Sequence, residues 1–230
     1  MSFGFRVEIK GDYACFSRPE LKVERVSYEV ITPSAARGIM EAVLWKPAIR
    51  YVIDRIDVCA PIRFENIRRN EVNSKIPYSS IQNAQEKLQK GELYLDASAD
   101  RSQRAAMVLR DVHYVISGHF KMTDKAGPAD NEGKFADMLR RRLEKGQHYH
   151  MPYLGTREFP AQIRLIADDE TPPAPIVESR SLGLMLYDID YIKSTDKKDK
   201  RAIVTAFEPV YFMAEMHGGI IDLRSVEVLK

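Results

Sequence analysis

The order of strand-like and helix-like segments constrains the fold of this chain more than any other feature. Alternation of apolar and polar residues predicts strands, and apolar residues at helical spacing between an N-cap and a stop predict helices. The predicted segments are, in order, strand 3–10, helix 32–47, strand 49–67, strand 108–122, helix 131–145 and strand 153–166. This order is that of a ferredoxin-like, split-βαβ domain, so we predict an α+β fold with RRM-like topology.

The acidic, proline-rich stretch "DDETPPAP" follows the last of these strands and predicts a domain boundary. We therefore predict a ferredoxin-like domain at 1–167 and a small antiparallel β-sheet region at 168–230, in which Gly218 and Gly219 form a hairpin turn. A polar and basic stretch at about 70–104 separates two predicted strands of the first domain. A loop of that length in a compact domain is usually functional or mobile.

Composition and motifs exclude several classes of protein. The 230 residues are 44% apolar and 30% charged with a net charge of only +2, which is typical of a soluble globular protein. Two cysteines are too few for a disulfide framework, and no signal peptide or apolar run of about 20 residues is evident, which predicts a cytoplasmic protein without membrane contact. No Walker loop, GxGxxG motif or nucleophile elbow is present, and we predict neither a metal site nor a cofactor.

Lys134 occupies an unusual position, in the first turn of the second predicted helix. The positive end of the helix dipole disfavours a cation there and favours the neutral amine. Such a lysine can move protons or hold a phosphate. The alternative interpretation is an exposed lysine paired with Glu132.

The predicted topology brings three polar side chains to one end of the domain. The second predicted strand starts near Tyr51, the third ends near His119, and the second helix starts near Lys134. All three are therefore candidate catalytic residues. His150 follows the far end of a helix about 20 Å long at ~1.5 Å per residue, so we do not expect it beside Lys134 unless the chain folds back.

Local clusters of arginine indicate contacts with nucleic-acid phosphates. Arg63, Arg68 and Arg69 form one cluster, and Arg140 and Arg141 form another. Together with His150, these side chains are the predicted RNA-binding residues. Separate solvated faces would give the same pattern, and double-stranded DNA is an alternative partner for the same arginines.

Five stretches then carry a resemblance to a known family. They are "GDYACFSRPELKVERVSYEVITPSAARGIMEAVLWKPAIR", "PIRFENIRRNEV", "DVHYVISGHF", "NEGKF" and "PYLGTREFPA". In this order the chain resembles the subtype I-C CRISPR-associated protein five, variant d, which we call Cas-five-d. The resemblance runs from the first strand to the fourth and continues more loosely to the C-terminus.

The resemblance implies a RAMP-type ferredoxin-like domain with a small C-terminal β-sheet. It implies an endoribonuclease that cuts CRISPR repeat RNA without a metal, by attack of a ribose 2′-OH on the adjacent phosphate. It also implies that the protein stays on the 5′ handle of the guide RNA, beside other Cascade subunits. Such a site needs a base, an acid and cations for the developing phosphorane charge.

The residues of the family motif carry over only in part. Lys134 matches the lysine of the "NEGK" motif, whereas the family tyrosine of "YWKP" is Leu44 here and the histidine after the lysine is Phe135. Tyr51 and His119 are the replacements that topology offers, and His150 with its neighbour is a second option. A binding subunit without catalytic activity is the alternative function.

Overall fold

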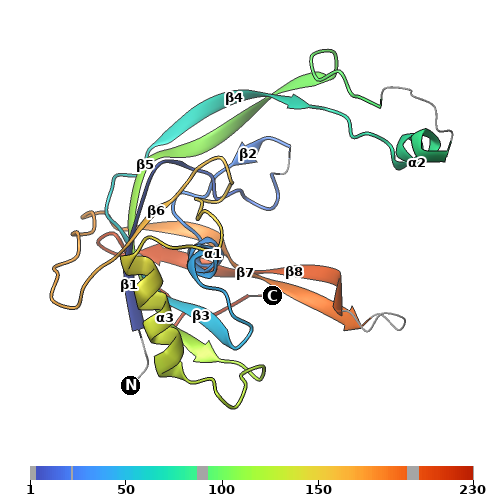
Figure 1. The fold of residues 1–230 in the computed structure, drawn as a ribbon. Coiled ribbons are helices and arrows are strands. Elements are labelled where there is room, and N and C mark those ends of the chain that lie inside the picture. Colours follow the sequence, from blue (N-terminus) through green and yellow to red (C-terminus); the bar gives the residue numbers. More distant parts are fainter. Residues whose placement is uncertain (1–3, 22, 87–92, 196–201, 230) are drawn as a thin grey trace.

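The computed structural model describes the chain except for residues 1–3, 22, 87–92, 196–201 and 230 (Figure 1). Its elements, in order, are β1 Gly4–Ala14, β2 Arg25–Val26, α1 Pro33–Val43, β3 Ile49–Val58, β4 Phe64–Val72, α2 Tyr78–Glu86, β5 Arg101–Met122, α3 Glu132–Glu144, β6 Gln162–Leu165, β7 Arg180–Thr195, β8 Ala202–Met216 and β9 Ile220–Asp222. The predicted α+β class is confirmed.

The main sheet has the strand order β6-β1-β5-β3-β9. The predicted strand 49–67 is divided into β3 and β4 at residues 59–63. With β3 as the second strand, β1, β3, β5 and β6 correspond to the four predicted strands. Their order across the sheet is fourth, first, third, second, and every neighbouring pair is antiparallel. The ferredoxin-like prediction is therefore confirmed, with β9 added at one edge.

Both long helices begin where local sequence predicts, and α1 ends at Val43, a few residues before its predicted end. The Thr32 hydroxyl accepts a hydrogen bond from the Ala35 N–H at 3.2 Å, which caps α1, and Asn131 Oδ1 accepts from the Lys134 N–H at 2.9 Å, which caps α3. The apolar side of each helix is buried against the same face of the sheet, in a core that includes Leu139. Because side chains alternate along strands, the other face of the sheet carries mainly polar groups.

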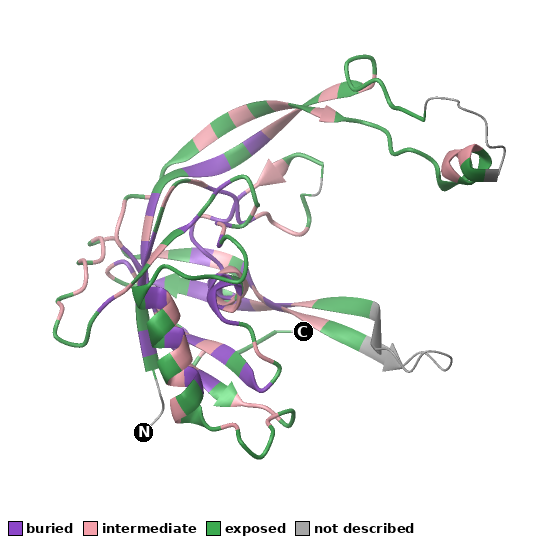
Figure 2. Cartoon of the chain, in the orientation of Figure 1, coloured by how far each residue is buried: buried purple, intermediate pink, exposed green. Residues whose placement is uncertain are grey.

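The stretch predicted as a long loop at about 70–104 contains α2 and the outer ends of β4 and β5. β4 pairs with the first half of β5 from Phe64↔Leu109 to Val72↔Arg101, and this hairpin forms an arm that leaves the body and ends near α2 (Figure 1). Buried residues gather in the body, whereas the outer part of the arm is exposed or half-buried (Figure 2). The prediction missed the outer part of the arm because its strands are too polar to show a buried face.

The C-terminal region forms a two-stranded antiparallel sheet of β7 and β8, as predicted. Gly218 and Gly219 both have positive φ, 56° and 74°, in the predicted turn. That turn leads into β9, which pairs with β3 of the main sheet. Core side chains of β7 and β8 join the same hydrophobic cluster as α1. The boundary at residue 168 stays a prediction.

The cysteines and the helix lengths bear on where the protein acts. Cys15 and Cys59 are both free thiols, and burial raises the pKa of Cys59 to about 11. Across the described part of the chain, no helix has both the length and the apolar character needed to cross a membrane. The predicted cytoplasmic location stays a prediction.

Candidate active site

Lys134 lies in an exposed cluster of charges at the start of α3. Its Nζ is 2.8 Å from Asp130 Oδ1, so its partner is Asp130 rather than the expected Glu132. Hydrogen bonds from Lys134 Nζ and from the Gly127 N–H hold the pKa of Asp130 below its usual range, and the charge of Lys46 adds to this effect. The Asp130 carboxylate therefore places a negative charge beside Lys134 at this end of the helix dipole. The Lys134 side chain remains exposed at the surface.

The two positions that depart from the family motif are fully packed. Leu44 is 0% and Phe135 2% exposed, so both belong to the core. Lys134 Nζ lies 5.6 Å from the centroid of the Phe135 ring. Phe135 therefore supports the lysine by packing, and it brings no group that transfers a proton.

Tyr51 lies on the same face of the sheet as the helices, yet its hydroxyl is engaged. The hydroxyl donates a hydrogen bond of 2.8 Å to the Leu44 carbonyl oxygen, and the side chain is 3% exposed. Burial raises the pKa of Tyr51 well above its usual range. The geometry makes Tyr51 a support for the end of α1, and its predicted catalytic role stays untested.

His119 lies at the same end of the sheet as Lys134 but on the opposite face. The neighbouring Phe120 packs against Tyr51 on the helix side, and side chains alternate along a strand, so His119 is on the open face. There His119 Nδ1 lies 2.8 Å from Asp54 Oδ2. Asp54 sits in an irregularity of β3, where the pairing with β5 shifts between Ile53 and Arg55. The bulge thus provides a carboxylate that orients the imidazole.

His150 is closer to the first helix than the length of α3 suggested. The backbone N–H groups of Tyr149 and His150 donate to the carbonyl oxygen of Ala42 at 2.8 and 3.4 Å. The His150 ring stacks on Tyr153, with centroids 6.2 Å apart and an interplanar angle of 26°. These bonds place His150 at the C-terminal end of α1, and its predicted role beside Lys134 stays untested.

The arginines of the arm do not form one patch. Arg68 and Arg69 are adjacent on β4 and point to opposite sides of the hairpin. Arg68 is exposed, whereas Arg69 pairs with Glu158 at 2.6 Å and lies over the Phe159 ring at 5.6 Å. Arg63, just before β4, is exposed as well. Only part of the predicted cluster is therefore free to contact RNA along this arm.

The arginines of α3 also point in different directions, because successive residues of a helix are about 100° apart. Arg140 pairs with Asp168 at 3.7 Å, Arg141 is exposed, and Arg142 donates to the carbonyl oxygen of Val43 at 2.5 Å. Arg142 thereby ties α3 to the end of α1.

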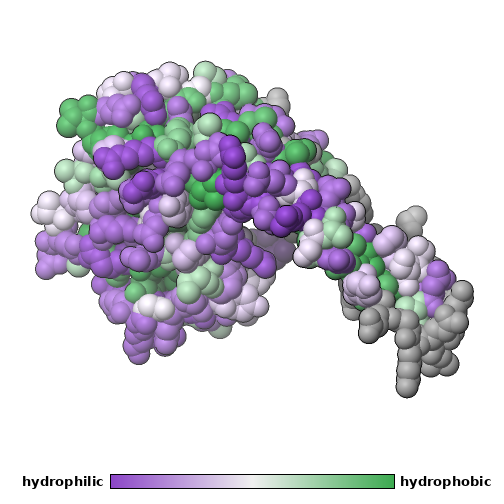
Figure 3. Space-filling view, turned by 90° about the horizontal axis from the view of Figure 1, so that it is seen from above, coloured by the Kyte–Doolittle hydropathy of each residue, from purple (hydrophilic) through white to green (hydrophobic). Residues whose placement is uncertain are grey.

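A mostly hydrophilic surface with small apolar patches is visible in Figure 3.

The open face of the sheet carries a charge network around Glu8. This carboxylate is 6% exposed and accepts hydrogen bonds from Lys10, His113 and Arg164 at 2.8, 2.8 and 2.7 Å. Burial raises its pKa, but these three donors outweigh burial and lower the pKa to about 2. The network joins β1, β5 and β6 across this face.

Several of these partners were not predicted from the sequence. Asp130 had a weak signal, because it precedes Lys134 by four residues. Asp54 had none, because it is 65 positions from His119 and its placement depends on a bulge. No group of three His, Cys, Asp or Glu side chains is arranged to hold a metal ion within the described residues.

The fold and this arrangement of charges define a ferredoxin-like α+β protein with an exposed lysine at a helix start and a long β-arm. The family model of Cas5d, described as CRISPR-associated protein (Cas_Cas5), matches residues 4–224. The chain therefore belongs to the Cas5d family of CRISPR-associated proteins, and the resemblance found in the sequence is confirmed.

Three relatives give the extent of the likeness. The chain is 49% identical over 227 residues to a protein of Mannheimia succiniciproducens named CRISPR pre-crRNA endoribonuclease Cas5d, covering 97% of this chain and 96% of that protein. It is 37% identical over 225 residues to the protein of the same name from Thermus thermophilus, covering 95% and 90%. A crystal structure of a CRISPR-associated protein shares the fold, with a TM-score of 0.67, 20% identity, and coverage of 96% and 92%.

Proposed function

We propose that this chain is an endoribonuclease that processes CRISPR repeat RNA into guide RNAs. The observation that carries the proposal is its 49% identity, over 97% of its length, to a protein named as a pre-crRNA endoribonuclease. The proposal extends to a subunit of Cascade that stays on the 5′ handle and contacts other Cascade subunits.

The proposed reaction is attack of a ribose 2′-oxygen on the adjacent phosphorus. The bond from phosphorus to the 5′-oxygen breaks, a base takes the proton of the 2′-OH, and an acid protonates the leaving oxygen. The products are a 2′,3′-cyclic phosphate and a 5′-hydroxyl. Lys134 in the first turn of α3 and Lys46 in the loop after α1 provide the positive charge that stabilises the phosphorane.

Two histidines, His119 and His150, are alternative proposals for one proton-transfer group. When His119 Nδ1–H donates to Asp54, Nε2 keeps its lone pair and can accept a proton. Its use together with Lys134 requires RNA to wrap around this end of the sheet, because the two side chains lie on opposite faces. His150 lies at the C-terminal end of α1, on the helix side of the sheet, and is the alternative proposal. Exposed Arg63, Arg68 and Arg141 are proposed to bind the RNA backbone.

The test uses the full chain, its own repeat RNA and EDTA, with products separated on denaturing gels. Lys134→Ala is expected to slow cleavage by about 10²–10³-fold, the range for loss of one preorganised electrostatic group. Lys125→Ala removes another exposed lysine from the loop before α3 and serves as the matched control. Full cleavage by Lys134→Ala would remove this lysine from the proposed site.

Parallel variants His119→Ala and His150→Ala identify the proton-transfer group. We expect only one of them to lose activity to the extent of Lys134→Ala. A repeat RNA with a single 2′-deoxy substitution at the cleaved nucleotide is expected to resist cleavage while binding normally. Cleavage of that RNA would exclude attack by the 2′-oxygen.

Burial of Leu44 and Phe135 favours a second candidate function, a subunit that binds the RNA handle without cutting it. Neither side chain can transfer a proton. The same assay separates the two functions, because a binding subunit retards repeat RNA on a native gel and leaves it intact on a denaturing gel.

A further inference from the structure

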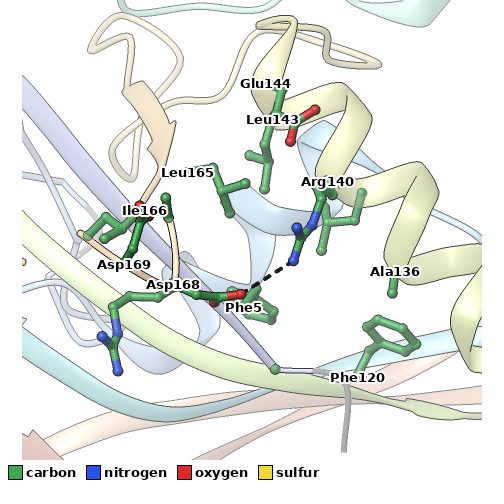
Figure 4. A pocket seen from close by; sticks show the side chains of 14 residues that line it. Phe5, Phe120, Ala136, Arg140, Leu143, Glu144, Leu165, Ile166, Asp168 and Asp169 are labelled. Atoms are coloured by element: carbon green, nitrogen blue, oxygen red, sulfur yellow. Dashed lines mark ion pairs between the residues drawn. The ribbon is translucent and has the colours of Figure 1, made fainter.

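A cavity of about 340 Å³ lies between α3, the start of β1 and the segment that follows β6 (Figure 4). One part of its wall is apolar. Phe5 comes from β1, Phe120 from β5, and Leu139 and Leu143 from α3, and Ile166 closes the side toward β6. All five side chains are at most 8% exposed, so these walls are fixed by the core of the domain.

The mouth of this cavity is acidic. Asp168, Asp169 and Glu144 surround it, and Arg140 is the cation that faces them (Figure 4). Arg6 also lines the cavity, but alternation along β1 directs its side chain to the open face of the sheet, opposite Phe5. Three carboxylates and one guanidinium leave a local charge of minus two.

Only one of the three carboxylates at the mouth has a cationic partner within the described part of the chain. Arg140 Nη2 lies 3.7 Å from Asp168 Oδ2, and both side chains are largely exposed. Glu144 and Asp169 are exposed on either side of this pair. An incoming cation can therefore pair with Glu144 or Asp169 without first breaking another ion pair.

The charge decides which class of partner fits. RNA brings phosphates, which two uncompensated carboxylates repel. A protein segment can bring an apolar side chain together with a cation. We propose that this cavity is a docking site for a partner protein, which inserts one apolar side chain flanked by a lysine or arginine. This role goes beyond RNA cleavage and does not depend on it.

The proposal can be tested with a phage-displayed library of random octapeptides selected on the immobilised full chain. Recovered peptides are then synthesised and titrated against wild type and three variants by fluorescence anisotropy. Ala136→Phe fills the cavity, and Glu144→Lys combined with Asp169→Lys reverses the charge of its mouth. Asp137→Lys, on an exposed position of α3 that does not line the cavity, is the matched control.

We expect the peptides to carry an apolar residue beside lysine or arginine. Their binding should weaken at least about tenfold in the filled and charge-reversed variants and stay within about twofold in the control. The charge-reversed chain should instead select acidic flanks. Failure to enrich any peptide, selection indifferent to charge, or full binding by Ala136→Phe would overturn the proposal.

Binding of repeat RNA to the same variants tests the alternative occupant. We expect Ala136→Phe to bind repeat RNA as wild type does, and RNA binding lost on filling the cavity would overturn the proposal in favour of an RNA base. If Ala136→Phe does not fold, the charge-reversed variant decides alone, because both of its substitutions are on exposed side chains.

Discussion

Glu8 offers the sharpest quantitative test of the structure. Its carboxylate is nearly buried on the open face of the sheet and is held by Lys10, His113 and Arg164. Glu8→Gln keeps the shape of the side chain and removes its charge. We expect this change to lower the free energy of unfolding by about 2–3 kcal/mol at pH 7.

The magnitude follows from the pKa of Glu8. Its fall from the ordinary value of 4.5 to about 2 corresponds to about 3 kcal/mol at ~1.36 kcal/mol per pH unit. Lys10 and Arg164 are about half exposed, so water can solvate them when the carboxylate is gone, and the expected loss is somewhat smaller.

The pH dependence has a fixed sign. Because the pKa is lower in the folded state, the contribution of Glu8 is present above pH 4.5 and is lost as the pH falls toward about 2. Urea unfolding of wild type and Glu8→Gln at several pH values measures this directly. The difference between the two should shrink by about 2 kcal/mol from pH 6 to pH 3.

A control separates this network from surface charge in general. Glu20 is exposed and lies 3.9 Å from Arg18, so Glu20→Gln should change the free energy of unfolding by less than about 0.5 kcal/mol. A loss below about 0.5 kcal/mol for Glu8→Gln, or a loss that does not depend on pH, would refute the reasoning.

Two other predictions concern the candidate site. Tyr51→Phe should lower the free energy of unfolding by about 1–3 kcal/mol in urea titrations, because the Leu44 carbonyl loses its buried donor, while cleavage changes by less than about threefold. Loss of cleavage in a folded Tyr51→Phe protein would restore its catalytic role. Arg68→Ala should reduce the dependence of log K for RNA on log salt by about 0.7–0.9, whereas Arg69→Ala, which breaks a pair with Glu158, should leave it nearly unchanged. Equal salt slopes for the two variants would contradict the orientation of these side chains.

Local rules predicted a large part of the fold. Thr32 and Asn131 cap the two long helices as their sequence positions require, and the Gly218-Gly219 turn is present. The helix starts and the end of α3 were accurate because caps act within one turn of the chain, whereas α1 ends at Val43, before the predicted end at residue 47. The outer part of the arm formed by β4 and β5 was missed, because cross-strand pairing supports it and no buried apolar face marks it.

The candidate site was predicted less well than the fold. Lys134 was found from its place in the helix and from the family motif. The prediction that His119 lies beside it considered which ends of the elements meet, but did not consider the two faces of the sheet. His150 was expected at a distance from Lys134, and that expectation stays a prediction. Its contact with α1 depends on backbone hydrogen bonds that no side-chain pattern indicates.

The sequence by itself determined the order of elements, the helix ends and the exposed lysine at the start of α3, because each depends on neighbours within a few residues. The tertiary structure decided which face each candidate side chain occupies and which partner it meets. Asp54 reaches His119 across 65 positions through a bulge, and Arg164 reaches Glu8 across 156 positions. Such pairs depend on strand register, and a shift of one residue would move every side chain to the other face.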